Sequence, residues 1–244
     1  MLEVRGFHLA AGNQVILRDL PLQVPGQGIT VLLGASGCGK SSVLRWLAGI
    51  LPPGLSARGE VRFDGRTADL PLPSLAFQPQ SDALFPWLTI AENAALGLRV
   101  AGLSARQAAA RVAPLFAPFG LAGTEALYPE ELSGGMRQRA AFLRTMVQES
   151  RFVLLDEPFS ALDAVTRLRM QTWLLERLRA APRGVLLVTH DLQEAAALGE
   201  RICVISKGRL VTLPVDLPHE ERSEAAMAPL RETLKSLLLE ERLP

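Results

Sequence analysis

The segment from Gly34 to Ser41, GASGCGKS, is the stretch of this sequence with the most specific chemistry. It fits the pattern G-x-x-x-x-G-K-[ST], between an apolar stretch (28–34) and a helical pattern (41–50). Glycines let successive backbone N–H groups converge on phosphate oxygens, and the N-terminus of the following helix adds a favourable dipole. A glycine-rich turn with an exposed lysine is the plain alternative. The strand–loop–helix context favours a phosphate-binding loop.

The side chains and the backbone of this loop are expected to play different parts. Lys40 would reach the β- and γ-phosphates of a nucleotide, and the Ser41 hydroxyl would bind Mg²⁺. The remaining loop positions would surround the phosphates, and they are Gly34, Ala35, Ser36, Gly37, Cys38, Gly39 and Ser42. Cys38 is given no catalytic role, because backbone geometry accounts for its place in a loop of glycines.

Two adjacent carboxylates, Asp156 and Glu157, end the apolar run that begins at Phe152. A buried strand would place Asp156 at its carboxyl end, where it could hold Mg²⁺ directly or through a water. Glu157 would then point to the opposite side and orient or deprotonate an attacking water. A carboxylate pair that caps a strand is common by itself, but the phosphate loop in the same chain favours a catalytic pair.

The elements that must position these residues read as alternating strands and helices, with a helical stretch in the middle. Capping boxes at Thr89–Glu92 and Ser104–Gln107 mark helix starts within that stretch. Strands separated by helices imply a parallel sheet in an α/β protein, here interrupted by a helical insertion. The expected strands are 2–4, 15–24, 28–34, 60–63, 74–77, 152–155, 185–188, 202–205 and 209–212, and the expected helices are 41–50, those within 82–148, 164–179, one from 191, and 229–240.

Composition limits the class of protein. The 244 residues are 48% hydrophobic and 21% charged, which is ordinary for a folded chain, and the net charge of +1 argues against a broad basic surface for nucleic acid. Two cysteines provide no disulfide framework, so we expect a reducing compartment. The N-terminal segment MLEVRGFHLA does not have a signal-peptide pattern, and prolines and glycines interrupt the longest uncharged stretch, 20–39. We therefore expect that the chain does not cross a membrane by itself.

Three further segments reveal a family resemblance. Together with the phosphate loop, LSGGMRQR (132–139), DEPFSALD (156–163) and LVTHD (187–191) resemble the motifs of ATP-binding-cassette (ABC) ATPases, in their order and spacing. The resemblance covers about residues 2–213. It implies an α/β fold: a RecA-like P-loop NTPase core with an antiparallel β portion and an inserted helical subdomain.

The resemblance also implies how the chain is divided. Residues 1–244 would form a single nucleotide-binding domain. Its RecA-like core would comprise about 1–81 and 149–213, its helical subdomain about 82–148, and its short C-terminal tail 214–244.

In this family two copies pack head to tail and trap two ATP molecules. By resemblance, Ser133, Gly134 and Gly135 of one copy would contact the γ-phosphate that Lys40 of the other copy holds. One chain has one phosphate loop and one LSGG segment, so it would supply half of each of two sites. A second ATPase subunit is therefore expected, and a homodimer is the simplest form.

Three more positions take their roles from the resemblance. His190 matches the histidine that contacts the γ-phosphate, and Asp163 matches the aspartate that couples the two sites across the dimer. The family's glutamine, which reaches both the catalytic centre and Mg²⁺, has two candidates, Gln78 and Gln80. The usual spacing from the segment 85–87 favours Gln80 and leaves Gln78 as the alternative.

One departure concerns the base of the nucleotide. Many members stack adenine on an aromatic residue before the phosphate loop, whereas Ala11 aligns with that position here. Stacking of a base on an aromatic side chain is worth ~1–3 kcal/mol in nucleic-acid binders. We therefore expect ATP to be held mainly through its phosphates with loose base selectivity, unless Phe7 or His8 replaces the missing aromatic residue.

The resemblance narrows the function to ATP hydrolysis that powers import through a separate membrane permease. The segments 80–98 and 156–175 are similar to the ATPases of nitrate, sulfonate, taurine and thiamine-precursor importers. The implied partners are integral membrane permease subunits and, indirectly, a solute-binding protein, with no nucleic acid. The implied location is the cytoplasmic side of the plasma membrane, as a peripheral subunit. Phe85 and Trp87 would either face the permease or pack inside the helical subdomain.

Two other functions are weaker candidates. An ABC ATPase of DNA repair, chromosome handling or translation would carry long coiled coils or two cassettes, and this chain has neither heptads nor a second LSGG. A regulatory ATP-binding module without turnover is disfavoured because Glu157 and His190 are both present.

Overall fold

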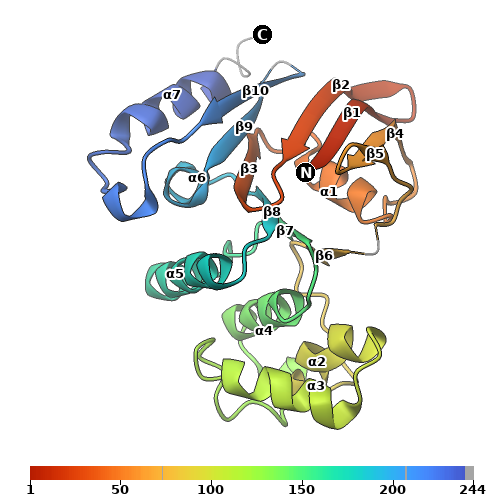
Figure 1. Ribbon diagram of the computed structural model, residues 1–244, viewed down its shortest axis with the longest axis vertical. Helices are drawn as coiled ribbons and strands as arrows, with labels where there is room; N and C mark the ends of the chain where they lie inside the picture. The colour runs from red at the N-terminus through yellow and green to blue at the C-terminus, as the bar shows by residue number, and fades with distance from the viewer. Residues whose placement is uncertain (73, 207, 240–244) are drawn as a thin grey trace.

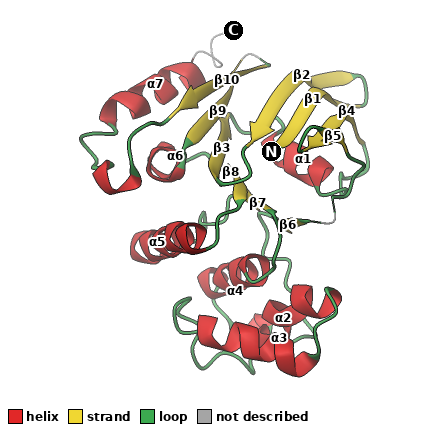
Figure 2. Cartoon of the chain, in the orientation of Figure 1, coloured by secondary structure: helices red, strands yellow, loops and turns green. Residues whose placement is uncertain are grey.

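The structure is a computed structural model that describes residues 1–72, 74–206 and 208–239. In these residues the strands form two sheets, and the helices lie around them and in a separate group (Figures 1 and 2). The strands are β1 (Leu2–Ala11), β2 (Gln14–Val24), β3 (Gly28–Gly34), β4 (Leu55–Phe63), β5 (Arg66–Thr67), β6 (Leu75–Gln78), β7 (Phe152–Asp156), β8 (Gly184–Val188), β9 (Arg201–Ser206) and β10 (Arg209–Pro214). The α-helices are α1 (Lys40–Leu47), α2 (Ile90–Val100), α3 (Ala105–Val112), α4 (Gly134–Met146), α5 (Ala164–Ala180), α6 (Leu192–Leu198) and α7 (Ala228–Leu239).

The larger sheet confirms the α/β fold class. Over the described residues its strand order is β10-β9-β3-β8-β7-β6, and its neighbours are parallel except β10, which runs antiparallel to β9. Strands β3, β7 and β8 are buried along nearly their whole length, as expected for a parallel sheet covered on both faces. The register pairs Leu32 with Val188 and Val188 with Asp156. The carboxyl ends of three central strands therefore meet at one edge of the sheet, where ligands bind in open α/β sheets.

The smaller sheet is antiparallel, in the order β2-β1-β4-β5. Its inner side chains share a core with α1, and the ring of Phe7 lies 4.7 Å from that of Trp46. The first strand was expected over 2–4 only, but β1 continues to Ala11. Pairing with β2 and β4 on both sides stabilises this extension, and such long-range pairing is not visible in a short sequence window.

Residues 82–148 contain helices and loops and no strand. Both expected capping boxes are confirmed at the starts of α2 and α3. The first of these helices, α2, begins at Ile90, directly after the predicted cap Thr89, and residues 82–88 before it form a loop. The buried side chain of Asn93 holds that loop: its amide bonds the N–H and the C=O of Phe85 as well as the C=O of Leu88 and Thr89.

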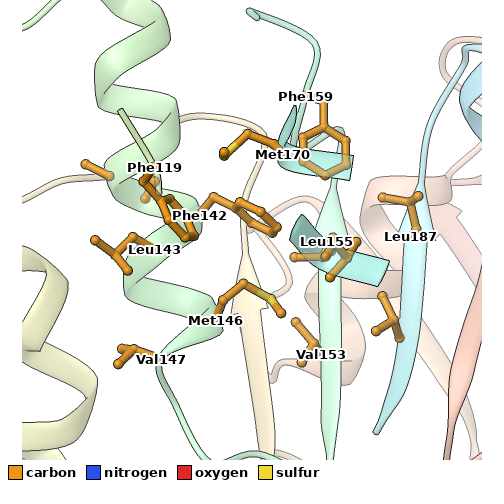
Figure 3. Close-up of a cluster of buried hydrophobic side chains, with 14 of the residues drawn as sticks. Phe119, Phe142, Leu143, Met146, Val147, Val153, Leu155, Phe159, Met170 and Leu187 are labelled. Atoms are coloured by element: carbon orange, nitrogen blue, oxygen red, sulfur yellow. The ribbon is translucent and has the colours of Figure 1, made fainter. Parts of the chain in front are cut away.

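Helix α4 lies between the α2–α3 pair and the larger sheet (Figures 1 and 2). Its buried side chains Phe142, Leu143 and Met146 belong to one apolar cluster with Val153 and Leu155 of β7 (Figure 3). The helix that carries the LSGG segment at its start thus contacts β6 and shares an apolar core with the strand that ends in Asp156.

The C-terminal part ends in α7, which contacts α6 and β9. A helix over 229–240 was expected, and α7 confirms it as far as Leu239; Glu240 lies outside the described residues. Within the residues described, no helix has both the length and the apolar character needed to span a bilayer.

Candidate active site

The phosphate loop connects the end of β3 to the start of α1. Gly39 is the N-cap of α1 with a φ of 98°, a left-handed conformation that favours glycine. A Cβ at this position would lie 2.9 Å from side-chain carbons of both Leu9 and Leu17. The loop therefore approaches the smaller sheet more closely than any other residue at position 39 would allow.

Lys40 is buried, with 7% of its surface exposed, so the alternative of an exposed lysine on a turn is wrong. Its ammonium group donates hydrogen bonds to the C=O of Gly34 at 2.7 Å and of Ala35 at 2.8 Å. The sulfur of Cys38 lies 3.9 Å from the same nitrogen. The cation is therefore held inside the curve of its own loop by groups that carry only partial negative charge.

Ser41, in the first turn of α1, contacts Asp156 at the end of β7. The Ser41 hydroxyl donates to Asp156 Oδ1 at 2.8 Å. Asp156 is fully buried, and its Oδ2 has no hydrogen-bond partner among the described residues. Burial raises the pKa of Asp156, and the hydrogen bond from Ser41 only partly opposes that shift. A buried carboxylate oxygen with unused acceptor capacity is suited to a cation.

Glu157 brings together two of the predicted catalytic residues. Its Oε2 lies 3.2 Å from Gln80 Nε2, which donates to it, and 3.2 Å from His190 Nδ1. Glu157 has a φ of 50°, in the left-handed region that a residue with a side chain rarely adopts. This turn directs its carboxylate toward the end of β8 and toward the loop after β6.

Gln80, rather than Gln78, lies at this site. Gln78 is the last residue of β6, is buried in the sheet, and its Oε1 has no hydrogen-bond partner among the described residues. Gln80 follows the strand by two positions and reaches Glu157.

A cavity of about 270 Å³ opens between the phosphate loop and the side chains of Gln80 and Glu157. Its walls carry backbone N–H groups, a lysine, hydroxyls, an amide and a carboxylate. That set can bind a polyphosphate and present a base to a water beside it. The lining residues are Ile16, Ser36, Gly37, Gly39, Lys40, Ser41, Ser42, Gln80 and Glu157.

Four predicted residues lie away from this cavity. Ser133 is the N-cap of α4 and accepts a hydrogen bond from Met136 N, and Gly134 and Gly135 form the first turn. Asp163 is the N-cap of α5, and the backbone N–H of Thr166 is the main cause of its lowered pKa. None of the four is among the residues described as lining the cavity, so one chain does not bring them to its own phosphate loop.

Known proteins with similar sequences decide the family. Residues 17–160 match the ABC transporter family model. The chain belongs to the ABC transporter family. The taurine import ATP-binding protein TauB of Mesorhizobium japonicum is 44% identical over 86% of this chain and 80% of its own length. The formylaminopyrimidine import ATP-binding protein ThiZ of Halalkalibacterium halodurans is 37% identical over 96% and 94%, and the aliphatic sulfonates import ATP-binding protein SsuB of Mycobacterium avium is 43% identical over 87% and 81%.

Membership in the ABC transporter family confirms the resemblance seen in the motifs and makes this chain an ATP-binding subunit and an ATPase. The sheet that carries the phosphate loop is the RecA-like part of that fold. The non-transport ABC ATPases are not favoured by these relatives.

Phe7 and His8, the two side chains that could have replaced the missing aromatic residue, both lie away from the cavity beside the phosphate loop. Phe7 is fully buried against Trp46, and His8 lines a separate hollow on the smaller sheet, so neither side chain reaches the nucleotide cavity. The apolar side chain that does line it is Ile16 of β2. The motifs did not identify Ile16, because one aliphatic residue in a strand carries no local signal.

Proposed function

We propose that this chain hydrolyses ATP to power import through a separate membrane permease. The observation that carries the proposal is the position of the Glu157 carboxylate, within 3.2 Å of both Gln80 and His190 at the edge of a cavity built on the phosphate loop. Import is supported by relatives whose names identify them as import ATP-binding proteins.

Lys40, Glu157 and His190 would each have a separate role in hydrolysis. When phosphate binds, the Lys40 ammonium would exchange the carbonyls of Gly34 and Ala35 for phosphate oxygens, a charge-assisted and stronger bond. Glu157 would accept a proton from the attacking water, and His190 would donate to the γ-phosphate. The loop N–H groups and the N-terminus of α1 would hold the remaining oxygens.

The residues present fit Mg²⁺. Oxygen donors are what this ion prefers. The Ser41 hydroxyl and the Asp156 carboxylate already face one another, and Asp156 Oδ2 is buried without a partner among the described residues. Ser41, Asp156 and Gln80 would hold the ion, which would neutralise charge on the β- and γ-phosphates.

A second copy is part of the proposal. Ser133, Gly134 and Gly135 start α4 with a hydroxyl and backbone N–H groups, which suit an anion. They lie outside the cavity of their own chain, which supports their action on the ATP held by Lys40 of a partner. Asp163, exposed at the start of α5, would couple the two sites across such a head-to-tail homodimer.

The same proposal assigns the chain's organisation and its place in the cell. Residues 1–244 form one nucleotide-binding domain, with a RecA-like core over about 1–81 and 149–213, a helical subdomain over about 82–148, and a tail over 214–244. The subunit binds its permease peripherally on the cytoplasmic side of the plasma membrane. Phe85 and Trp87 are 38% and 70% exposed and lie ring to ring at 5.3 Å, which supports a role at the permease surface.

The test has two arms. Purified chain is assayed for phosphate release from ATP with Mg²⁺, with Glu157→Gln as the inactive reference. Tagged chain is then recovered from detergent-solubilised membranes of its host and its partners are identified by mass spectrometry. We expect turnover and a multi-span permease with a solute receptor. Recovery of nucleic acid or only soluble proteins would overturn the import function while leaving the ATPase intact.

A further inference from the structure

The side-chain amide of Gln138 in α4 bonds the backbone of the loop that follows β7 at two places, and its Nε2 also lies 3.5 Å from the Ser160 hydroxyl. Its Nε2 donates to the C=O of Glu157 at 3.2 Å, and its Oε1 accepts from the N–H of Ala161 at 2.9 Å. Only 5% of Gln138 is exposed. The side-chain amide therefore pairs with both ends of this loop as a strand neighbour would, in a place from which water is largely excluded.

Glu157 depends on such support, because its left-handed backbone costs of order 1–3 kcal/mol and persists only when its surroundings hold it. Its N–H donates to the C=O of Val188 at 2.9 Å, at the end of β8. Its C=O accepts from Gln138 on the other side, and from the Ser160 hydroxyl at 3.0 Å. The peptide groups on both sides of the catalytic carboxylate are thus tied, one to the sheet and the other to α4.

An aromatic contact holds the same loop on α4 independently of these hydrogen bonds. Phe142 lies one turn after Gln138 and meets Phe159 edge to face, with ring centroids 5.2 Å apart and planes at 80° (Figure 3). Both rings are buried. Because this packing does not involve the amide, we expect loss of the Gln138 hydrogen bonds to change the orientation of the Glu157 carboxylate without unfolding the loop.

We propose that Gln138 is a positioning residue that fixes the orientation of the Glu157 carboxylate for hydrolysis. Gln138 does not line the cavity and acts through the backbone of Glu157. Because Ser133 caps the same helix, Gln138 also joins the start of the LSGG helix to the general base. This inference rests on the function proposed above, in which Glu157 is that base.

Two substitutions test it. Gln138→Met keeps the volume and removes both hydrogen bonds, and Gln138→Glu keeps the acceptor for Ala161 N but removes the donor to Glu157 O. We expect Gln138→Met to lower kcat about 10- to 100-fold, the cost of a small misplacement of a catalytic group. The affinity for ATP should stay within about twofold, because the phosphate contacts are unchanged.

The pH profile of Gln138→Glu separates positioning from loss of stability. Burial at this position would raise the pKa of the new carboxyl, and the protonated form regains a donor toward Glu157 O, so kcat relative to the unmodified chain should rise as pH falls. Gln148→Met is the matched control: it lies beyond the other end of α4, where its amide bonds the C=O of Arg144, and kcat should not change. If Gln138→Met does not fold, the Gln138→Glu profile decides.

A kcat for folded Gln138→Met within about twofold of the unmodified chain would overturn this inference, as would a pH-independent ratio for Gln138→Glu. Absence of turnover in the unmodified chain would instead overturn the proposed function, so the two failures are distinguishable.

Discussion

The Ser41 hydroxyl donates a 2.8 Å hydrogen bond to Asp156 Oδ1, across 115 residues of sequence. It joins the first turn of α1 to the end of β7, two elements that lie against one another in the sheet core. The hydroxyl is a neutral donor, so it stabilises the buried carboxylate only in part, and burial still raises the pKa of Asp156. A cation would therefore stabilise the ionised form of Asp156 more than the neutral serine hydroxyl does.

The substitution Asp156→Asn tests this cation site. Asparagine keeps the size and the acceptor for Ser41 but removes the charge, so we expect Mg²⁺-dependent hydrolysis to fall by at least about 100-fold while ATP still binds in the presence of EDTA. For the unmodified chain, the tightening of ATP binding by Mg²⁺ should increase with pH, because the ion needs the ionised form of a carboxyl whose pKa is raised. Titration calorimetry at pH 5.5 and 7.5, with Mg²⁺ or EDTA, measures both. An unaltered Mg²⁺ effect in Asp156→Asn would place the ion elsewhere.

Glu157→Gln tests the general base. The amide keeps contacts with Gln80 and His190 but cannot accept a proton from water, so we expect kcat to fall by about 10²- to 10⁴-fold. The affinity for ATP should remain within about threefold, because the phosphate contacts are made by other residues. Phosphate release and equilibrium dialysis report the two quantities. Glu176→Gln, on the exposed face of α5, is the control with the same chemical change. Full turnover in Glu157→Gln would remove Glu157 from its role.

Lys40→Ala acts on binding rather than on chemistry. Hydrogen bonds to a charged group contribute about 1.5–3 kcal/mol, so deleting the ammonium should weaken ATP binding roughly 10- to 150-fold. Lys235→Ala, an exposed lysine on α7 beside Glu232, controls for the loss of one positive charge. Fluorescence titration with a labelled ATP analogue measures both variants. Unchanged affinity in Lys40→Ala would contradict the contact with phosphate.

We expect base selectivity to depend on the aliphatic side chain of Ile16, which lines the cavity. Because Ile16 lines the cavity and Phe7 is buried, the base has an aliphatic contact and no aromatic stacking from β1. We expect the affinities for ATP and GTP to lie within about fivefold of one another. Ile16→Tyr should tighten both by up to ~1–3 kcal/mol, the range for stacking on a ring. A strong preference of the unmodified chain for ATP would show that another group reads the base.

The site divides into residues that sequence identifies and residues that it does not. Asp156 ends one apolar strand and the phosphate loop with Lys40 follows another, so a motif and a strand pattern are enough to bring them together at one edge of a parallel sheet. Gln138 lies within the segment LSGGMRQR, yet its bonds with Glu157 and Ala161 depend on how α4 packs against the larger sheet. Packing of that kind is set by side chains far apart in sequence. The length of β1 was missed for the same reason.

Glu194 provides a test in which stability, not activity, depends on pH. It is buried at the start of α6, and burial raises its pKa although Thr189 and Gln171 form hydrogen bonds with it. The folded chain therefore binds this proton more tightly than the unfolded chain does. Its contribution to stability is complete below the ordinary glutamate pKa of about 4.3, and is lost as pH rises from there through the raised value.

Glu194→Gln removes this titration and keeps a neutral partner for Gln171, whose Nε2 donates to the carboxyl at 3.1 Å. The variant should therefore melt at a higher temperature than the unmodified chain at pH 8, and the difference between the two should shrink as pH falls to 5. Asp156 also has a raised pKa, but it titrates in both chains, so the difference isolates Glu194. Differential scanning calorimetry across this range decides the matter. If the melting temperature of Glu194→Gln instead falls relative to that of the unmodified chain as pH rises from 5 to 8, the hydrogen-bond partners of Glu194 stabilise its ionised form more than burial destabilises it.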